Sequence, residues 1–266
     1  MSAVEVARGT WVVAYRDLLA FVRDRARVAA SITFPLLFLA IFGAGFNNVI
    51  GQMAPGVDLL RFMYPGILCM AVLTSALSAG LSIVTDREDG FLREILVAPL
   101  ARSGIVLGKA AGAAAVALVQ ALLLLLVAPV VGVTLSLAIV VRLVPIVVLL
   151  SVTLSGLGIV IGSFLRSQQG FQMILQLLVF PMVFLAGVFY PVDTLPLWME
   201  VLSKVNPVTY GVDAIRQVFL GADAAAAGLG VTVFGRTMRL GEEVAIVGVL
   251  GLMLLAAATV AFSRRE

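Results

Sequence analysis

Residues 143–165 read LVPIVVLLSVTLSGLGIVIGSFL, a run of 23 residues without one charged side chain. About 20 mostly apolar residues are enough for an α-helix to cross the hydrocarbon core of a lipid bilayer. Arg142 and Arg166 flank the run, so its charge-free length is close to that of one membrane crossing. The stretch therefore predicts a transmembrane helix.

The composition of the whole chain supports the same interpretation. Of its 266 residues, 62% are hydrophobic and 12% are charged. Ordinary soluble domains contain about 45–50% apolar residues, glycine included, and about 25% charged residues. A soluble globule has nowhere to bury so much apolar surface, so we predict an integral membrane protein. A soluble enzyme, a disordered tail and a disulfide scaffold are excluded.

Charge-free stretches of this kind occur at six places along the chain. Pro129 and Gly132 break the longest of them, and the helix after this break is expected to begin near residues 142–145. We expect an all-α polytopic membrane protein with a single transmembrane domain over residues 1–266. Its six spans are expected at residues 28–48, 62–84, 103–128, 143–165, 169–189 and 243–263.

The N-terminal segment, residues 1–27, has the pattern of an amphipathic helix that lies at the cytoplasmic interface of the membrane. Trp11 and Tyr15 would anchor it there, because these side chains favour the membrane–water boundary. A soluble cytoplasmic helix that packs on a partner is the alternative. The apolar residues that recur at steps of three and four are Val4, Ala7, Trp11, Tyr15, Leu18 and Val22.

The basic residues predict the orientation of the spans. With the N-terminus in the cytoplasm, most of the 18 Lys and Arg residues fall on the cytoplasmic side, as the positive-inside rule requires. Both termini are therefore expected to be cytoplasmic. The same rule accounts for the net charge of +3, so we infer no nucleic-acid partner.

The sequence offers no catalytic residue and no metal site. It contains no histidine and one cysteine, Cys69. Residues Gly104–Ala110 resemble a phosphate-binding loop only superficially, because three residues instead of four separate the glycines and Ala110 has no hydroxyl for magnesium. The expected spans carry no charge away from their ends, which argues against ion-driven transport. The chain is thus not expected to be an enzyme.

Glycines recur at every fourth position at two places in the expected spans. Gly104, Gly108 and Gly112 form one series, and Gly158 and Gly162 form the other. Small residues at this spacing let two helices approach closely. Both series therefore predict faces of helix packing.

Neutral polar side chains occur in the second to fifth expected spans. Thr74 and Ser78 lie in the second span, whereas Gln169, Gln172 and Gln176 share one face of the fifth. Amides that faced lipid would lack hydrogen-bond partners. These side chains either hold helices together or line a cavity.

The first cytoplasmic loop, residues 85–102, carries dense charge followed by an apolar stripe. Residues 85–104 read TDREDGFLREILVAPLARSG, in which Pro99 would stop a helix that begins near Asp89. A short amphipathic helix of this kind can dock into a groove of a soluble partner. A solvated loop whose charges merely hold the topology is the alternative.

The outer segment, residues 190–221, is expected to form two short re-entrant or surface-lying helices. Pro191 and Pro196 break the chain before a first helix over Leu197–Val205. Asn206 and Pro207 are typical of the N-cap and first residue of a second helix. Such a segment is tolerated at membrane depth only where protein or water covers it, and it could cap an outward exit.

The whole arrangement resembles the permeases of type-2 ATP-binding-cassette (ABC) exporters, nearest the bacterial drug-resistance and lipo-oligosaccharide or polysaccharide export permeases. The cytoplasmic part of the resemblance is TDREDGFLREILVAPLARSGIVLGK, residues 85–109. Ala186 departs from the family, which often has Ser before the glycine. The outer part comprises Phe180-Pro181, Phe184-Leu185-Ala186-Gly187, Tyr190-Pro191, Leu195-Pro196, Asn206-Pro207 and Tyr210.

The resemblance implies a half-transporter in a bacterial cytoplasmic membrane. It would pair with itself or a similar permease, above two copies of a separate ABC ATPase. ATP and magnesium would bind to that ATPase, and this chain would carry no cofactor. The cargo would be an amphiphilic drug, a lipid, or a glycolipid or polysaccharide.

The resemblance also implies roles for particular residues. The ATPase-coupling residues would be Asp86, Glu88, Asp89, Phe91, Leu92, Arg93 and Glu94. The substrate path would be lined by Thr74, Ser78, Gln172 and Gln176, and the outer gate would contain Pro191, Pro196, Asn206 and Pro207.

Two other classes of function are kept as alternatives. An ion-coupled secondary transporter or channel would need an inverted repeat or charge inside the membrane, and the sequence offers neither. A non-transporting membrane scaffold would need no polar path. It would be favoured if Gln172 and Gln176 proved to be functionally inert.

Overall fold

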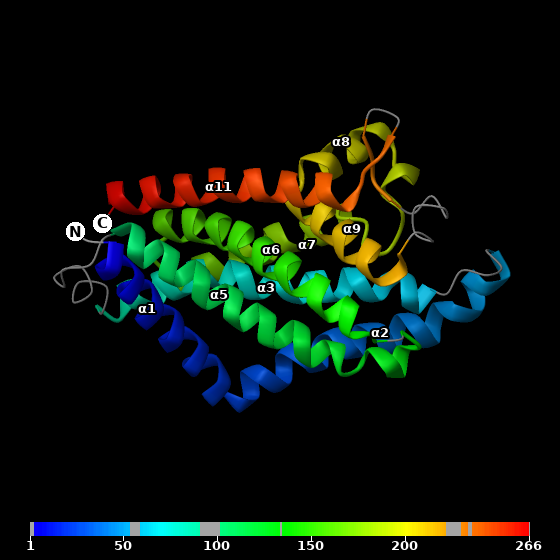
Figure 1. Ribbon diagram of the computed structural model, residues 1–266, viewed down its shortest axis with the longest axis horizontal. Coiled ribbons are helices and arrows are strands. Elements are labelled where there is room, and N and C mark those ends of the chain that lie inside the picture. Colours follow the sequence, from blue (N-terminus) through cyan, green and yellow to red (C-terminus); the bar gives the residue numbers. More distant parts are fainter. Residues whose placement is uncertain are drawn as a thin grey trace.

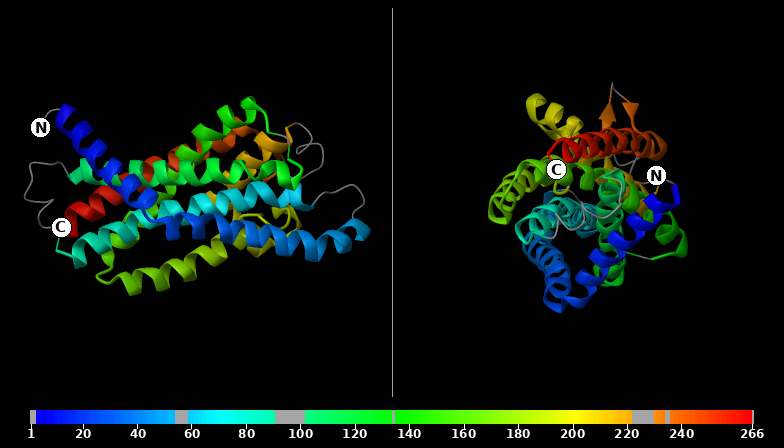
Figure 2. Two further views of the ribbon diagram at one scale, coloured as in Figure 1. Left: turned by 90° about the horizontal axis from the view of Figure 1, so that it is seen from below. Right: turned by 90° about the vertical axis from the view of Figure 1, so that its left-hand side faces the viewer.

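The computed structural model describes residues 3–53, 59–90, 102–133, 135–221, 230–233 and 236–265, and this part of the chain is mainly helical. Six of its helices are long and apolar enough to cross a membrane, which confirms the predicted all-α polytopic fold. They run together along the long axis of the molecule, and both termini lie at one end (Figure 1; Figure 2). The six are α2 (Arg25–Met53), α3 (Leu59–Glu88), α5 (Arg102–Leu125), α6 (Leu137–Phe164), α7 (Gln168–Leu185) and α11 (Leu240–Arg265).

The other described elements lie before and between these helices. Helix α1 precedes α2, and the rest belong to the end of the bundle opposite the termini (Figure 1). The two short strands pair antiparallel, with Thr232 opposite Thr237. These elements are α1 (Ala3–Arg23), the 3-10 helices η1 (Ala128–Val131) and η2 (Val192–Thr194), α8 (Leu197–Val205), α9 (Pro207–Leu220), β1 (Thr232–Val233) and β2 (Arg236–Thr237).

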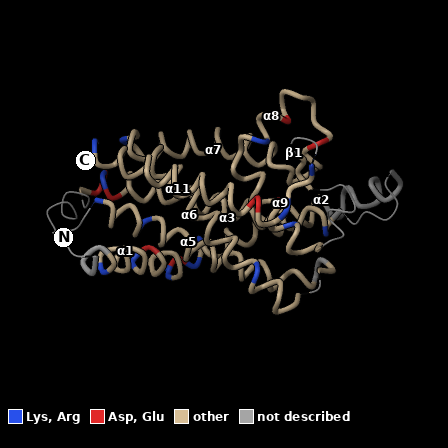
Figure 3. The backbone as a smooth tube through the Cα atoms, turned by 45° about the horizontal axis from the view of Figure 1, so that its top comes forward, with Lys and Arg blue, Asp and Glu red and all other residues tan. Residues whose placement is uncertain are grey.

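Charged side chains are unevenly distributed along the molecule. Figure 3 marks the charged residues along the backbone, which lie at the end that carries both termini, along α1, and around α9, with long uncharged stretches between. A charge at the centre of a bilayer costs free energy, whereas charges at its edges are solvated. This distribution therefore fits helices that cross a membrane.

Helix α3 forms the centre of the bundle and packs against α5, α6 and α9. It meets α6 at three glycines. A Cβ atom on Gly80 would collide with the carbonyl oxygen of Gly158, and one on Gly162 would lie 2.6 Å from the carbonyl oxygen of Gly80. The two backbones are thus in direct contact, as the spacing of Gly158 and Gly162 predicted.

Helix α1 packs along α5 on the other predicted glycine series. A Cβ atom on Gly108 would meet Val13, and one on Gly112 would meet Asp17. Val13 and Phe21 are buried in this contact, whereas Trp11 and Tyr15 are exposed on the far side of α1. The apolar stripe predicted from the sequence is therefore the outward face of α1, free to contact the membrane surface.

Several helices begin or end at other residues than the expected spans do. Helix α3 continues to Glu88 and so includes the first charges of the predicted cytoplasmic loop. Helix α6 begins at Leu137, earlier than expected, because the Ser136 side chain caps it by accepting a hydrogen bond from the Ile139 amide. Helix α7 ends at Leu185, and Gly187 turns the chain there with a φ of 73°.

The two short helices of the outer segment are present as predicted. Asn206 caps α9 through a 3.0 Å bond from the Val208 amide to its Oδ1 atom, and its Nδ2 atom donates to the Met182 carbonyl at 2.7 Å. Helix α9 is buried against α3, α6 and α11, whereas Trp198 on α8 is exposed. Of these two helices, α9 therefore re-enters the protein, and α8 lies at the protein surface.

Candidate functional site

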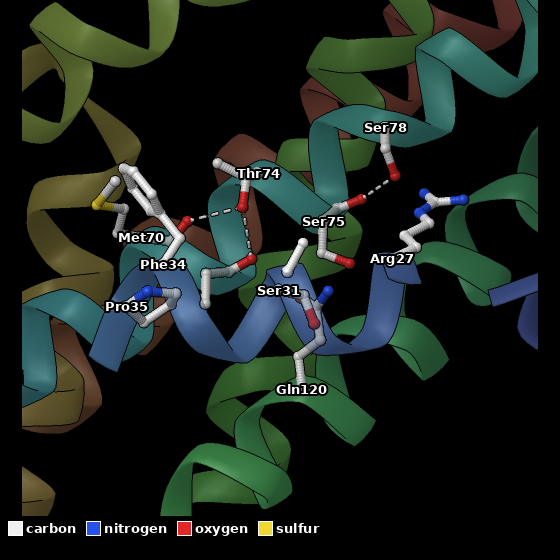
Figure 4. A pocket seen from close by; sticks show the side chains of 11 residues that line it. Arg27, Ser31, Phe34, Pro35, Met70, Thr74, Ser75, Ser78 and Gln120 are labelled. Atoms are coloured by element: carbon white, nitrogen blue, oxygen red, sulfur yellow. Dashed lines mark hydrogen bonds between the residues drawn. The ribbon is translucent and has the colours of Figure 1, made fainter. Parts of the chain in front are cut away.

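Two adjoining cavities lie along one side of α3. The first has a volume of about 340 Å³ and lies between α2, α3 and α5; Figure 4 shows the side chains that converge on it from these helices. The second has a volume of about 350 Å³ and lies between α2, α3 and α7. Phe34, Met70 and Thr74 line both cavities, so we describe them together as the groove.

The first cavity is the polar half of the groove. Its hydroxyl groups donate to their own helices: Thr74 Oγ1 to the Ala71 carbonyl at 3.0 Å, Ser78 Oγ to the Ser75 carbonyl at 2.6 Å, and Ser31 Oγ to the Val28 carbonyl at 2.7 Å. Each hydroxyl oxygen keeps its lone pairs, so it can still accept a hydrogen bond. This wall therefore carries several hydroxyl oxygens that can accept hydrogen bonds from an occupant.

Two further polar atoms of this half are buried. Ser75 and Gln120 are 5% and 7% exposed, and Ser75 Oγ and Gln120 Oε1 have no hydrogen-bond partner within the described chain. Buried polar atoms are nearly always paired with protein or water. A water molecule or a bound molecule with donor groups would satisfy them.

The second cavity is the aromatic half of the groove. Phe38 stacks on Phe42 with ring centroids 4.7 Å apart, and Phe184 lies 4.5 Å from Phe180 and 5.1 Å from Phe189. Ring pairs at these separations attract one another beyond the burial of their area. They form an apolar wall across α2, α7 and the turn after α7, suited to a hydrocarbon chain or ring system.

The groove lies on a face that the described part of the chain leaves exposed. Phe180 and Leu177 on α7 are 65% and 77% exposed, and Phe34 and Leu37 on α2 are more than half exposed. Large exposed apolar faces of this kind are covered by lipid or by another protein. An occupant could therefore enter the groove from the side.

The structure separates the four residues predicted to line the path. Thr74 lines both cavities, Ser78 lines the first, and Gln176 lines the second. Gln172 is exposed on α7 and belongs to neither cavity. The predicted outer residues Pro191, Pro196, Asn206 and Pro207 lie in the turn, α8 and α9 beyond the aromatic half.

A buried cluster of charges joins α1, α3 and α5 next to the polar half. Lys109 Nζ lies 2.6 Å from Asp86 Oδ2 and 3.5 Å from Asp17 Oδ2, and Arg16 Nη2 lies 3.1 Å from both carboxylates. Burial lowers the pKa of Arg16, but the charges of Asp86 and Asp17 outweigh it and raise that pKa above its ordinary value. Asp86, one of the predicted coupling residues, thus pairs within its own chain and joins α3 to α1 and α5.

Sequence reasoning missed this cluster because it assigned Lys109 to the cytoplasmic edge. The side chain is 1% exposed, and its position about two turns inside α5 is the only signal that the sequence contained. A small cavity of about 100 Å³, lined by Asp17, Ser78, Ser82 and Lys109, connects the cluster with the groove.

The described part of the loop predicted to be cytoplasmic is anchored as well. Arg87 donates to the carbonyl oxygens of Gly162 and Leu165, and Glu88 Oε1 accepts from the Gln168 amide at 3.2 Å. The end of α3 is thereby fixed to the turn between α6 and α7. Asp89 is exposed, and the predicted coupling residues Phe91, Leu92, Arg93 and Glu94 lie outside the described residues.

A second buried cluster, also missed from the sequence, joins the outer elements. Arg216 on α9 lies 3.8 Å from Asp213, donates to the Gly187 carbonyl at 2.6 Å, and has its guanidinium carbon 4.2 Å from the centre of the Phe62 ring. Asp213 Oδ2 accepts from the Val231 amide at 2.9 Å. Helix α9 is thus tied to α3, to the turn after α7, and to β1.

A family model described as ABC-2 type transporter matches residues 8–220. The chain belongs to the ABC-2 type transporter family. It is therefore an ABC transporter permease, a multi-pass membrane subunit of a kind that works with an ABC ATPase. The match includes α3, α7 and the groove between them. A cluster of three or more residues suited to holding a metal ion does not occur among the residues that the structure describes.

Individual relatives cover most of this ABC-2 chain. A protein named transport permease ycf38, from Porphyra purpurea, is 27% identical over 210 residues, which are 76% of this chain and 70% of that protein. Nodulation protein J from Rhizobium leguminosarum bv. trifolii is 29% identical, over 70% of this chain and 71% of that protein. A protein named as a multidrug ABC transporter permease, YbhR of Escherichia coli strain K12, is 31% identical over 62% of this chain and 45% of that protein.

Proposed function

We propose that this chain is the membrane half of an exporter that moves an amphiphilic drug, a lipid, or a glycolipid or polysaccharide out of a bacterial cell. The observation that carries the proposal is the groove, which is polar at one end and aromatic at the other. An amphiphile needs both kinds of surface at once, because its head keeps hydrogen bonds while its tail avoids water. The nodulation and multidrug names of two relatives are compatible with such cargo.

The active unit in this proposal contains two permeases, this chain and a second copy or a similar chain. The exposed faces of α2 and α7 support it, because the amides of Gln172 and Gln176 lie there among apolar side chains. An amide that faced hydrocarbon would lose its hydrogen bonds. A partner across this face would give the amides a polar surrounding and close the open side of the groove.

Energy enters through a separate ABC ATPase that binds ATP and magnesium, with one copy under each permease. The loop over residues 85–102 contacts this ATPase, and the termini lie on the same, cytoplasmic side as the loop. One continuous helix, α3, connects Thr74 and Ser78 in the groove with Asp86 and Glu88 at the loop. Because Glu88 also binds the start of α7, a push on the loop would move α3 and α7, two of the three helices that line the aromatic half.

The decisive experiment is purification of the tagged chain in mild detergent, followed by mass spectrometry and by reconstitution into liposomes. We expect a stoichiometric ATPase with an intact phosphate-binding loop, and ATP-dependent movement of a fluorescent amphiphile. If the chain purifies alone and ATP moves nothing, the ion-coupled carrier and the non-transporting scaffold become the better explanations.

A further inference from the structure

The polar half of the groove contains one cation among hydrogen-bond acceptors. Arg27 lines this cavity and also the small cavity beside it. Its guanidinium carbon lies 5.7 Å from the centroid of the Phe21 ring, and no carboxylate pairs with it in the described part of the chain. Arg27 is exposed, and the two carboxylates near it are engaged elsewhere: Asp17 pairs with Lys109 and Arg16, and Asp24 Oδ1 accepts from the Arg27 backbone amide at 3.0 Å. A guanidinium that faces a cavity without a paired carboxylate attracts an anion.

Besides the guanidinium of Arg27, the wall of this cavity has two donors, the unpaired Ser75 hydroxyl and the Gln120 amide nitrogen, and its other polar side-chain atoms only accept hydrogen bonds. The hydroxyl protons of Ser31, Ser78 and Thr74 are already donated to backbone carbonyls, so these oxygens can only accept. Gln120 Oε1 is an acceptor by its chemistry, and it is buried without a donor. A ligand head that carries several hydroxyl groups would supply what this wall lacks.

The order of the two halves along the helices gives the direction of the occupant. Arg27 is at the junction of α1 and α2, and from there α2 runs toward the end of the bundle that carries α8 and α9 (Figure 1). The aromatic wall follows Arg27 in that direction, through Phe34 and Phe38 to Phe189. A molecule with its head at Arg27 would therefore extend its tail toward the middle of the membrane, as a lipid of the cytoplasmic leaflet does.

We infer that the amphiphile carried by this permease has an anionic head rich in hydroxyl groups, such as a phosphate ester of a polyol or sugar, and that Arg27 binds its anion. Gln120 and the serine and threonine oxygens accept hydrogen bonds from its hydroxyls, and the phenylalanine wall holds its tail. The inference rests on the proposed function, because it names the cargo of the same groove. Cationic amphiphiles are disfavoured, since Arg27 would repel their heads.

The test uses the complete transporter, permease and ATPase together, in lipid nanodiscs, with probes that share one oleoyl tail. Lysophosphatidylglycerol has an anionic head with hydroxyls, lysophosphatidylcholine has a zwitterionic head, and oleoyl choline has a cationic one. We expect lysophosphatidylglycerol to bind at least tenfold more tightly than the other two and to stimulate ATP hydrolysis. A single charge-assisted hydrogen bond corresponds to roughly a tenfold difference in affinity.

Three variants separate the contributions of charge and hydroxyl recognition. Arg27→Gln should weaken lysophosphatidylglycerol binding roughly tenfold and should not weaken the binding of oleoyl choline, which has no anion for Arg27 to bind. Arg23→Gln, which removes an exposed arginine at the end of α1, should change neither probe. Gln120→Leu should reduce the preference for lysophosphatidylglycerol over lysophosphatidylmethanol, which has the same charge and lacks the head-group glycerol.

The outcomes distinguish the inference from the proposed function. Tighter binding of oleoyl choline, or unchanged lysophosphatidylglycerol binding in a well-folded Arg27→Gln transporter, would overturn the anionic head while ATP-driven export stands. A wild-type complex that binds none of the three probes also overturns it, provided the ATPase is still attached. Absence of an ATPase from the purified chain would instead overturn the proposed function.

Discussion

At the scale of single residues, Lys109 is the side chain that joins α5 to both α1 and α3. It is 1% exposed and pairs with Asp86 from α3 and Asp17 from α1. Removing one partner of a buried ion pair is strongly destabilising, by about 3–5 kcal/mol, because the remaining charge stays buried without compensation. We therefore expect Lys109→Met to lower the thermal unfolding temperature of the detergent-solubilised protein markedly.

The matched control is Lys204, whose partner Glu200 lies one turn away on the partly exposed surface of α8. Exposed pairs contribute about 1 kcal/mol or less, so Lys204→Met should melt close to the wild type. Adding Asp86→Asn to Lys109→Met should restore part of the stability. Equal melting of the Lys109 and Lys204 variants would show that the cluster adds little to stability.

Side-chain positions in the groove and in the charged cluster could be predicted from the sequence only in part. Thr74 and Ser78 share a wall because helical spacing puts residues four apart on one face. Lys109 was missed because its partners lie on two other helices, and only the packing of α1 and α3 on α5 brings them together. Gln172 and Gln176 share a face, yet the cavity ends between them, which spacing alone does not reveal.

At the scale of elements, the crossing of α3 and α6 depends on the absence of side chains at Gly80, Gly158 and Gly162. An added Cβ on Gly80 would collide with a backbone oxygen that cannot move without its helix. Overpacking of a close-packed interior costs about 1–3 kcal/mol, and more where backbone must shift. Gly80→Ala should therefore reduce folded yield and melting temperature.

Gly248 on α11 provides the comparison, because an added Cβ there meets nothing within 4 Å. Alanine favours a helix over glycine by about 1 kcal/mol, so Gly248→Ala should be neutral or slightly stabilising. Both variants are assayed by fluorescence-detected size exclusion after heating. Normal stability of Gly80→Ala would mean that the two helices do not touch as the structure has them.

The elements themselves were largely predictable, since each has a local cause. Charge-free length locates the six crossings, and Pro196, Asn206 and Pro207 locate the starts of α8 and α9. The tertiary role of α9 was not predictable. Its burial depends on the contacts of Arg216 with the Phe62 ring and the Gly187 carbonyl. Both partners are far from Arg216 in the sequence.

At the scale of the whole molecule, the open groove makes a prediction about assembly. If a second copy covers α2 and α7, a cysteine in place of exposed Gln172 should be close to its counterpart across the two-fold axis. The buried native thiol, Cys69, is first replaced by alanine so that the new cysteine is the only reactive one. A short bis-maleimide should then join two permeases through position 172 in membranes.

The control position is Leu252 on α11, which is 72% exposed and belongs to neither cavity of the groove. Leu252→Cys should cross-link poorly, because in this arrangement its side chain faces lipid. Cross-linking at position 252 that equals or exceeds that at position 172 would place the partner on the other side of the molecule.

ATP binding should raise the cross-linking yield at position 172. Gln172 lies near the start of α7, the end that Glu88 ties to α3 and the cytoplasmic loop. Closure of the two ATPases would draw the loops together, and with them the starts of both α7 helices, while the groove turns outward. A non-hydrolysable ATP analogue should therefore raise cross-linking at position 172 above its level without nucleotide, whereas a decrease would show that the two permeases separate at this end when ATP binds.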